Sequence, residues 1–127
     1  MQVIKSENIK FFDVDGTLIL PSLGIDDPPK SLYADIYDAV TEKYIRVLVH
    51  QPMVRLLREE HHRGGHVIVW SRSGYEWAAN VVRALDLVPY VNQVMSKPLA
   101  YFDDADVSTW MKDRVYLTPD TVYKKSP

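Results

Sequence analysis

The chain has 127 residues, of which 46% are hydrophobic, so its length fits one globular domain with one core. Its 15 basic and 17 acidic residues nearly balance, which argues against a strongly basic nucleic-acid-binding surface. The absence of cysteine excludes disulfides, thiolate zinc sites, cysteine-ligated iron–sulfur clusters and a cysteine nucleophile. There is neither a signal-peptide pattern nor an apolar run near the roughly 20 residues that cross a bilayer, so we expect a cytoplasmic protein without membrane contact.

The first part of the chain predicts a buried strand followed by a loop-rich insertion. Residues 9–14 (IKFFDV) are short, apolar and β-rich, which is typical of a buried strand. After Leu20, three prolines and a glycine fall within nine residues and predict a loop. Residues 31–43 fit either a hairpin arm or a short helix, and residues 44–50 (YIRVLVH) indicate an extended segment.

The middle of the chain alternates helices with strands. Residues 52–63 predict a helix, because proline suits a first turn and the following Gly-Gly pair ends it. Residues 66–70 (HVIVW) predict a buried strand. Residues 73–85 predict a second helix with Ser73 as its N-cap and Trp77 on its apolar side, in the core. The remaining expected elements are strands at 90–95 and 99–102, a short helix at 107–112 and a strand at 115–117.

Strands that alternate with amphipathic helices favour an α/β layer fold with a mainly parallel sheet. Three expected strands end in polar residues: Asp13 and Asp15 follow the first, Ser71 the next, and Asp103-Asp104 a later one. In a parallel sheet these ends share one edge, where reactive residues gather. We therefore expect these side chains to converge.

The residue types at that edge suit phosphate chemistry. Carboxylates without thiolates favour Mg²⁺, and a carboxylate such as Asp13 can attack phosphorus. A second carboxylate two positions on, Asp15, can protonate the leaving oxygen and then activate water. Thr17 and Ser71 offer hydroxyl donors to a phosphate, and Arg72 has the charge to pair with one.

Several of these residues also have purely structural interpretations. The D-x-D-G string by itself also fits a plain turn after a strand. It does not fit a calcium loop, because that loop needs glycine at its sixth position, which here is Leu18. Arg72 is equally compatible with an ordinary surface arginine.

The string FFDVDGTL, residues 11–18, resembles the first motif (hhhDxDGT) of the haloacid dehalogenase superfamily of phosphohydrolases, and VIVWSRSG is similar to the second. The resemblance implies that Asp13 is the nucleophile and a metal ligand. It implies that Asp15 is the acid/base and offers its backbone carbonyl to Mg²⁺. It also implies that Ser71 binds phosphoryl oxygens.

Two later strings carry the rest of the resemblance. In MSKP, Lys97 looks like the third-motif lysine, which stabilises the nucleophile and the transferring phosphoryl group. YFDD resembles the fourth motif, which implies that Asp104 binds Mg²⁺ and Asp103 pairs with Lys97, although the two roles are open to exchange. Only six positions separate Lys97 from Asp103, a spacing that suits compact members with a minimal cap.

The resemblance implies one domain over residues 1–127, with a Rossmann-like three-layer sandwich around a mainly parallel sheet. Residues 21–50 are too few for a lid domain and predict a short flap. An open site of this kind accepts a small phosphorylated molecule or a macromolecular end, or a partner subunit completes it, so homo-oligomerisation stays open.

The expected activity is Mg²⁺-dependent hydrolysis of a phosphate monoester through an aspartyl-phosphate on Asp13. One alternative keeps this intermediate and transfers the phosphoryl group to another alcohol. A second alternative, from a different class, is a catalytically silent phosphate-binding or assembly module.

Overall fold

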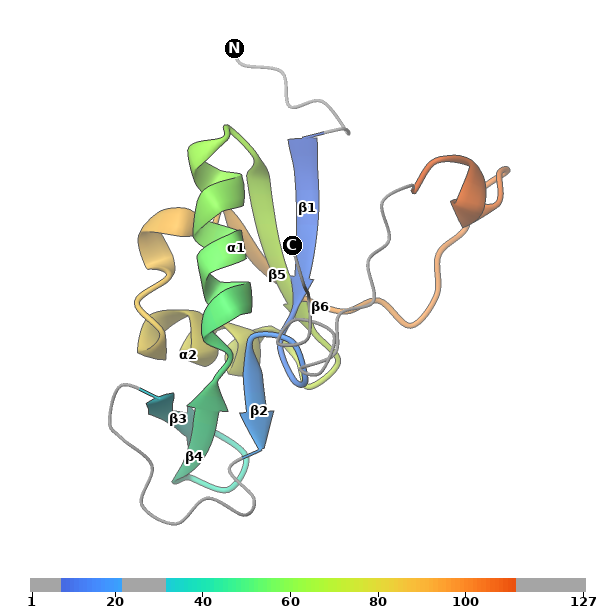
Figure 1. Cartoon of the computed structure of the whole chain (residues 1–127). Helices are drawn as coiled ribbons and strands as arrows, with labels where there is room; N and C mark the ends of the chain where they lie inside the picture. The colour runs from blue at the N-terminus through green and yellow to red at the C-terminus, as the bar shows by residue number, and fades with distance from the viewer. Residues whose placement is uncertain (1–7, 22–31, 112–127) are drawn as a thin grey trace.

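A parallel three-stranded sheet forms the centre of the molecule. The computed structural model describes residues 8–21 and 32–111, so the strand predicted at 115–117 lies outside it. The strands β1 (Ile9–Asp13), β5 (His66–Ser71) and β6 (Gln93–Ser96) stand in the order β1-β5-β6, all parallel (Figure 1). The prediction of an α/β fold with a parallel sheet is confirmed.

Two helices connect these strands. Helix α1 (Gln51–His62) leads from the inserted strands into β5, and α2 (Tyr75–Ala84) leads from β5 towards β6. Successive parallel strands step in one direction across the sheet, and right-handed crossovers then place both helices on the same face. Among the described residues, no helix has the length and apolar character needed to cross a membrane.

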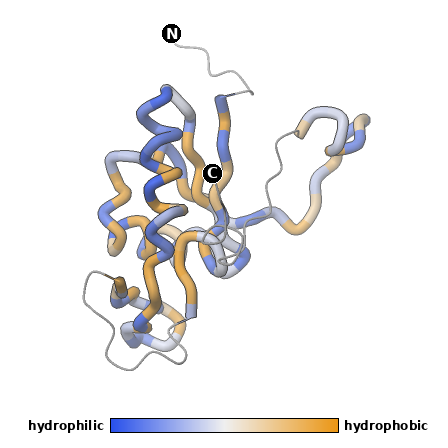
Figure 2. Tube along the Cα trace, in the orientation of Figure 1, coloured by the Kyte–Doolittle hydropathy of each residue, from blue (hydrophilic) through white to orange (hydrophobic). Residues whose placement is uncertain are grey.

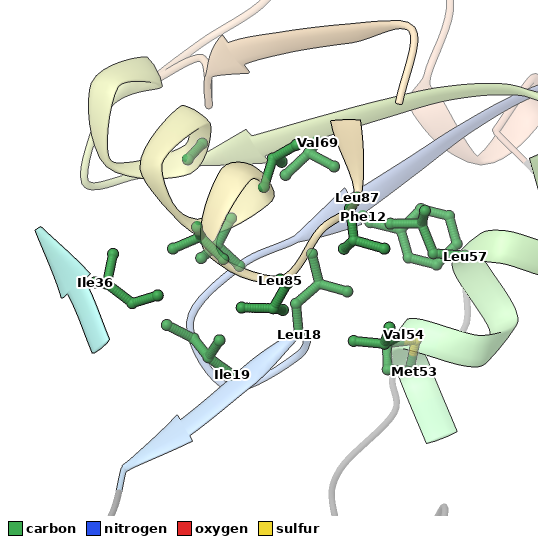
Figure 3. Close-up of a cluster of buried hydrophobic side chains, with 14 of the residues drawn as sticks. Phe12, Leu18, Ile19, Ile36, Met53, Val54, Leu57, Val69, Leu85 and Leu87 are labelled. Carbon is green, nitrogen blue, oxygen red and sulfur yellow. The ribbon is translucent and has the colours of Figure 1, made fainter. Parts of the chain in front are cut away.

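The core lies between this sheet and its helices (Figure 3). Phe12 and Val69 are paired across β1 and β5 and point to the helix side. From α1, Met53, Val54 and Leu57 are buried against them, as their spacing of one and four positions requires. Hydrophobic residues gather in the first half of α1, and its end is hydrophilic (Figure 2). Helix α2 contributes the buried residues Ala78, Val81 and Val82 to the core.

The opposite face of the parallel sheet carries aromatic side chains. Phe11 and Trp70 stack with their ring centroids 4.1 Å apart, and Phe11 is 38% exposed. Among residues 8–21 and 32–111, no helix covers this face. The described residues therefore form two layers, one of strands and one of helices.

The described residues of the predicted flap, 32–50, belong to a small antiparallel sheet, whereas most of the loop predicted after Leu20 lies outside the described residues. The strands β2 (Ile19–Pro21), β4 (Lys43–Val49) and β3 (Tyr33–Asp38) pair in the order β2-β4-β3. The segment that fitted a hairpin arm or a helix is described from residue 32 on, and it supplies a hairpin arm, β3. Alternate side chains point inward, and Ile36 and Val47 join the core.

The outer face of the β3–β4 hairpin is polar and aromatic. Asp35 and Arg46 stand directly opposite each other and form a two-pronged ion pair, with the shorter N–O distance 2.9 Å. The hydrogen bond from the Arg46 guanidinium lowers the pKa of Asp35. Arg46 also lies over the Tyr33 ring, 3.9 Å from its centroid, and Tyr37 meets Tyr44 edge to face across the strands.

Helix α2 begins differently from the prediction. Ser73 is not its N-cap, because the helix starts at Tyr75 after Gly74, whose φ of 102° is open to glycine without strain. The Ser73 hydroxyl instead donates to Asp15, far away in the sequence. A non-local acceptor therefore competes with the capping interaction that the local pattern suggested.

The strand predicted at 90–95 is also shorter than expected. Residues Val88–Tyr90 form the 3-10 turn η3, with Pro89 in its first turn. The side-chain oxygen of Asn92 accepts a hydrogen bond from the Val67 N–H, and the backbone N–H of Asn92 donates to the Val67 carbonyl. The strand β6 then starts at Gln93.

The last predicted elements are only partly found. Residues 99–102 do not form a strand, and Leu99 and Phe102 are almost fully exposed. This segment runs away from the sheet in Figure 1 and pairs with no described strand edge. The predicted helix at 107–112 is the single 3-10 turn η4 (Val107–Thr109).

Candidate active site

A tight loop after β1 positions the two leading carboxylates. The carbonyl of Val14 accepts three backbone N–H groups, and Gly16 turns the chain with a φ of 82°. The loop returns far enough for Asp15 to form a β-bridge with Ile19, where β2 begins. The donors to Val14 O are the N–H groups of Thr17, Leu18 and Ile19. Asp13 and Asp15 are thereby held on one rigid turn rather than on a mobile loop.

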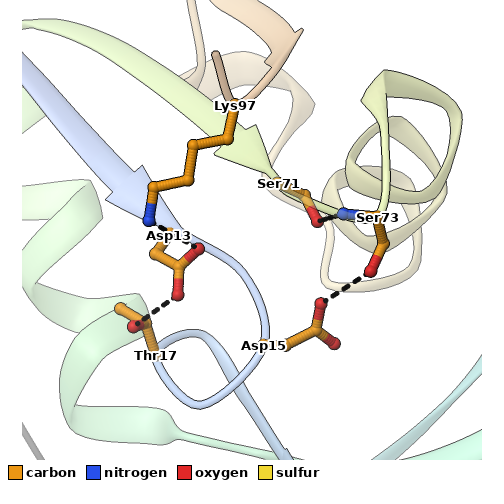
Figure 4. A network of polar contacts seen from close by, with 6 residues as sticks. All are labelled: Asp13, Asp15, Thr17, Ser71, Ser73 and Lys97. Carbon is orange, nitrogen blue, oxygen red and sulfur yellow. Dashed lines mark hydrogen bonds and ion pairs between the residues drawn. The ribbon is translucent and has the colours of Figure 1, made fainter. Parts of the chain in front are cut away.

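Asp13 has its own pair of donors (Figure 4). The Thr17 hydroxyl donates to Asp13 Oδ2 at 3.3 Å, and Lys97 Nζ lies 3.8 Å from Asp13 Oδ1. The side chains of Asp13 and Lys97 are each 34% exposed. The carboxylate is therefore oriented by a hydroxyl and a cation, yet it remains accessible from solvent.

Asp15 is held by a different pair. The Ser73 hydroxyl donates to Asp15 Oδ2 at 3.4 Å, and the indole N–H of Trp77 donates to Asp15 Oδ1 at 3.3 Å. Both donors come from the β5–α2 connection and the start of α2. Asp15 is thus hydrogen-bonded to residues that follow β5, whereas Asp13 contacts Thr17 of its own loop and Lys97.

Lys97 reaches Asp13 because the sheet places it there. It follows β6 directly, and its backbone N–H donates to Ser71 O at 2.8 Å, continuing the β5–β6 pairing. Its ammonium group also lies 5.5 Å from the centroid of the Trp70 ring. Lys97 is therefore brought to the predicted site, although its carboxylate partner is Asp13.

Ser71 and Thr17 occupy supporting places. Ser71 is 1% exposed, and its hydroxyl oxygen accepts the backbone N–H of Ser73 at 3.0 Å. The Thr17 hydroxyl faces Asp13, and the Thr17 carbonyl lies 2.7 Å from Nδ1 of the buried His50. The Ser71 hydroxyl thus stabilises the start of the β5–α2 connection, and the Thr17 hydroxyl stabilises the Asp13 carboxylate.

An open pocket of about 640 Å³ joins these elements. Its lining carries two carboxylates, two cations and a hydroxyl: Asp13, Asp15, Arg72, Lys97 and Ser73. The formal charges of the carboxylates and the cations balance, so the pocket itself does not repel a phosphate dianion. Arg72 is exposed at the rim and is brought together with both carboxylates, as predicted.

Asp103 and Asp104 are not brought to this pocket. Both are exposed in the segment that leads away from the sheet, and Asp103 Oδ1 accepts the N–H of Ala105 in a local turn. The expected pairing of Asp103 with Lys97 is not observed, since Lys97 faces Asp13. The metal-ligand role of Asp104 remains a prediction that this placement does not support.

The oxygen donors present are compatible with Mg²⁺. No group of three or more histidine or acidic side chains able to hold a metal occurs in the described ranges. Mg²⁺ does not require one, because proteins often hold it through one or two carboxylates while water and substrate phosphate complete the octahedron. Asp13 and Asp15 therefore fit such an ion without a third carboxylate.

The sequence did not point to three residues of the site. Ser73 was expected to cap a helix, Trp77 was expected in the core or stacked on a base, and His50 was considered only as a possible metal ligand. Trp77 does pack against the core, but its indole N–H reaches Asp15. The available signal was that Ser73 and Trp77 stand four positions apart, just beyond a strand that ends at the site.

Comparison with known proteins adds no further constraint: no protein-family model, no curated protein and no solved structure matches the chain. The function must therefore be inferred from the residues and their geometry.

Proposed function

We propose that the chain is a Mg²⁺-dependent phosphatase that hydrolyses a phosphate monoester through an aspartyl-phosphate on Asp13. The observation that carries this proposal is the pocket in which Asp13 and Asp15, two positions apart, share a wall with Lys97 and Arg72. The resemblance of residues 11–18 to the first motif of the haloacid dehalogenase superfamily supports the same assignment.

In the first step, a carboxylate oxygen of Asp13 attacks phosphorus and the bond to the leaving oxygen breaks. Asp15 gives a proton to that oxygen, so an alcohol departs. In the second step, water attacks phosphorus, Asp15 takes a proton from the water, and phosphate leaves while the Asp13 carboxylate is regenerated. Both amino acids return to their starting states.

The cations of the pocket have distinct tasks. Lys97, already 3.8 Å from Asp13 Oδ1, is placed to stabilise negative charge on the transferring group. Arg72 at the rim supplies planar donors for a phosphate oxygen. Mg²⁺, held by Asp13 and the Asp15 carbonyl, would screen the carboxylate from the phosphate and polarise the phosphoryl oxygens.

The fold architecture, the substrate class and the cellular location are further parts of the proposal. We propose the Rossmann-like three-layer sandwich that the resemblance implies; the described residues supply two of its layers, and no described helix covers the sheet face that carries Phe11 and Trp70. The open pocket supports a phosphorylated small molecule or a macromolecular end as the substrate. The cysteine-free composition is compatible with a cytoplasmic location.

The decisive experiment uses an aryl phosphate with Mg²⁺. We expect the wild type to hydrolyse it and Asp13→Asn to lower kcat at least about 1,000-fold, because loss of a nucleophile removes the covalent route. Asp86→Asn is the matched control: it is the same change at an exposed residue with a φ of 55°, which asparagine tolerates.

Two other results would favour the alternatives. If an added alcohol receives the phosphoryl group in preference to water, the chain is a phosphotransferase. If the wild type binds Mg²⁺ and phosphate but turns over no ester across a broad panel, the enzyme assignment fails and a phosphate-binding module remains.

A further inference from the structure

Each carboxylate oxygen of Asp15 faces one donor. The Trp77 indole N–H donates to Oδ1 at 3.3 Å and the Ser73 hydroxyl to Oδ2 at 3.4 Å. Asp13 has different donors, the Thr17 hydroxyl and the Lys97 ammonium group. The two carboxylates are thus oriented independently.

Both donors to Asp15 are themselves fixed. Trp77 packs its ring against the core, and an indole has only two side-chain torsions, so its N–H direction follows the packing of α2. Ser73 is anchored at its backbone, where its N–H donates to the hydroxyl oxygen of the buried Ser71 at 3.0 Å. The direction of the Asp15 carboxylate is therefore set by α2 and by the end of β5.

We propose that Trp77 and Ser73 are positioning residues that aim Asp15 at the leaving oxygen of the substrate, and that they determine which leaving groups the enzyme accepts. This inference rests on the proposed function, in which Asp15 is the proton donor. An alkyl alcohol leaves poorly without a proton, whereas an activated phenol such as p-nitrophenol leaves almost without assistance. Correct aim of Asp15 therefore matters for alkyl phosphates and little for activated aryl phosphates.

The kinetic test compares kcat/KM for an alkyl phosphate and for p-nitrophenyl phosphate, since this ratio reports the step in which the leaving group departs. In Trp77→Phe, which keeps a ring in the core, and in Ser73→Ala, we expect kcat/KM to fall about 10-fold or more for the alkyl ester and about threefold or less for the aryl ester. An equal fall for both esters would indicate a merely structural role and overturn the proposal.

Matched controls exist elsewhere in the chain. Trp110→Phe changes an exposed tryptophan outside the pocket, and Ser108→Ala removes another serine-to-aspartate hydrogen bond, the one to Asp106. Both variants should keep the wild-type ratio of the two kcat/KM values. A ratio that moves as far in these controls as in the site variants would also overturn the proposal.

A spectroscopic measurement separates this inference from the enzyme assignment. The indole N–H resonance of Trp77 should shift upfield in Asp15→Ala, because its acceptor is lost, and should stay in place in Asp13→Asn. If the resonance is unchanged in Asp15→Ala and the wild type is active, the positioning role of Trp77 is wrong, whereas the proposed phosphatase activity is retained. A wild type that hydrolyses neither ester overturns the phosphatase, whatever the resonance does.

Discussion

Asp13 and Asp15 stand on the same turn, yet their surroundings differ in ways that match two chemical roles. Asp13 faces a cation, Lys97, which suits a group that must carry a phosphoryl charge. Asp15 faces two neutral donors, which suits its proposed role of directing a proton at the leaving oxygen. The local pattern predicted the turn because the backbone hydrogen bonds that close it lie within six residues. It could not identify Ser73 and Trp77, which come from the β5–α2 connection and the start of α2.

The role of Asp104 is decided by one comparison. If Asp104 is a ligand, as the resemblance predicts, Asp104→Ala should raise the Mg²⁺ concentration for half-maximal activity about 10-fold or more, and high Mg²⁺ should partly restore the rate. The same titration on Asp103→Ala tests the exchanged roles, and Asp106→Ala serves as a control from the same segment. An unchanged Mg²⁺ requirement in both would agree with their exposed positions and leave the Asp13 carboxylate and the Asp15 carbonyl as the proposed protein ligands.

At the scale of elements, the β3–β4 hairpin links the flap to the rest of the domain. Its inner residue Ile36 is fully buried, and the Asn80 side chain of α2 donates to the Tyr37 carbonyl at 2.9 Å. The sequence of residues 31–43 could not distinguish a hairpin from a helix, because its alternation of apolar and polar residues is short and acquires meaning only through pairing with β4. Helix α1, with an apolar face in its first half and clear ends, was predictable.

The hairpin should derive its stability from its inner face. We expect Ile36→Ala to lower the free energy of unfolding by about 2–4 kcal/mol, because it leaves a cavity in the shared core. Val40→Ala, at a position that is 92% exposed in the turn, should change it by about 0.5 kcal/mol or less. Urea unfolding followed by circular dichroism measures both. Equal effects would show that the hairpin does not belong to the cooperative core.

At the scale of the whole molecule, the predicted convergence holds for the ends of β1 and β5, which bring Asp13, Asp15 and Ser71 together, but not for Asp103 and Asp104. Lys97, which follows β6, was assigned to the site by the resemblance alone. The apolar string at 99–102 has a strand-like composition, but a strand also needs an edge to pair with, and composition carries no information about a free edge. The exposed Leu99 and Phe102 show the result of having no partner in the described part of the chain.

Ligand binding should stabilise the whole domain without any turnover. Beryllium trifluoride with Mg²⁺ mimics a phosphoryl group on an aspartate, and at 100 times its dissociation constant it should add about 2.7 kcal/mol. For a domain of this size we expect the melting temperature to rise by about 5–15 °C. Asp13→Asn should abolish the rise, as differential scanning calorimetry would show. A rise that persists in Asp13→Asn would place the phosphoryl mimic on another group.

The position of Lys97 directly after β6 links the proposed chemistry to a short edge strand. Among the described residues, β6 has four residues and lies at an edge of the parallel sheet, and the Lys97 N–H donates to Ser71 O just beyond its end. Short edge strands open before the core does, through fluctuations that cost far less than global unfolding. If the proposed function is correct, fraying of a few residues would move Lys97 away from Asp13 while the other elements keep their places, so mild heat or denaturant would abolish the activity before the domain unfolds.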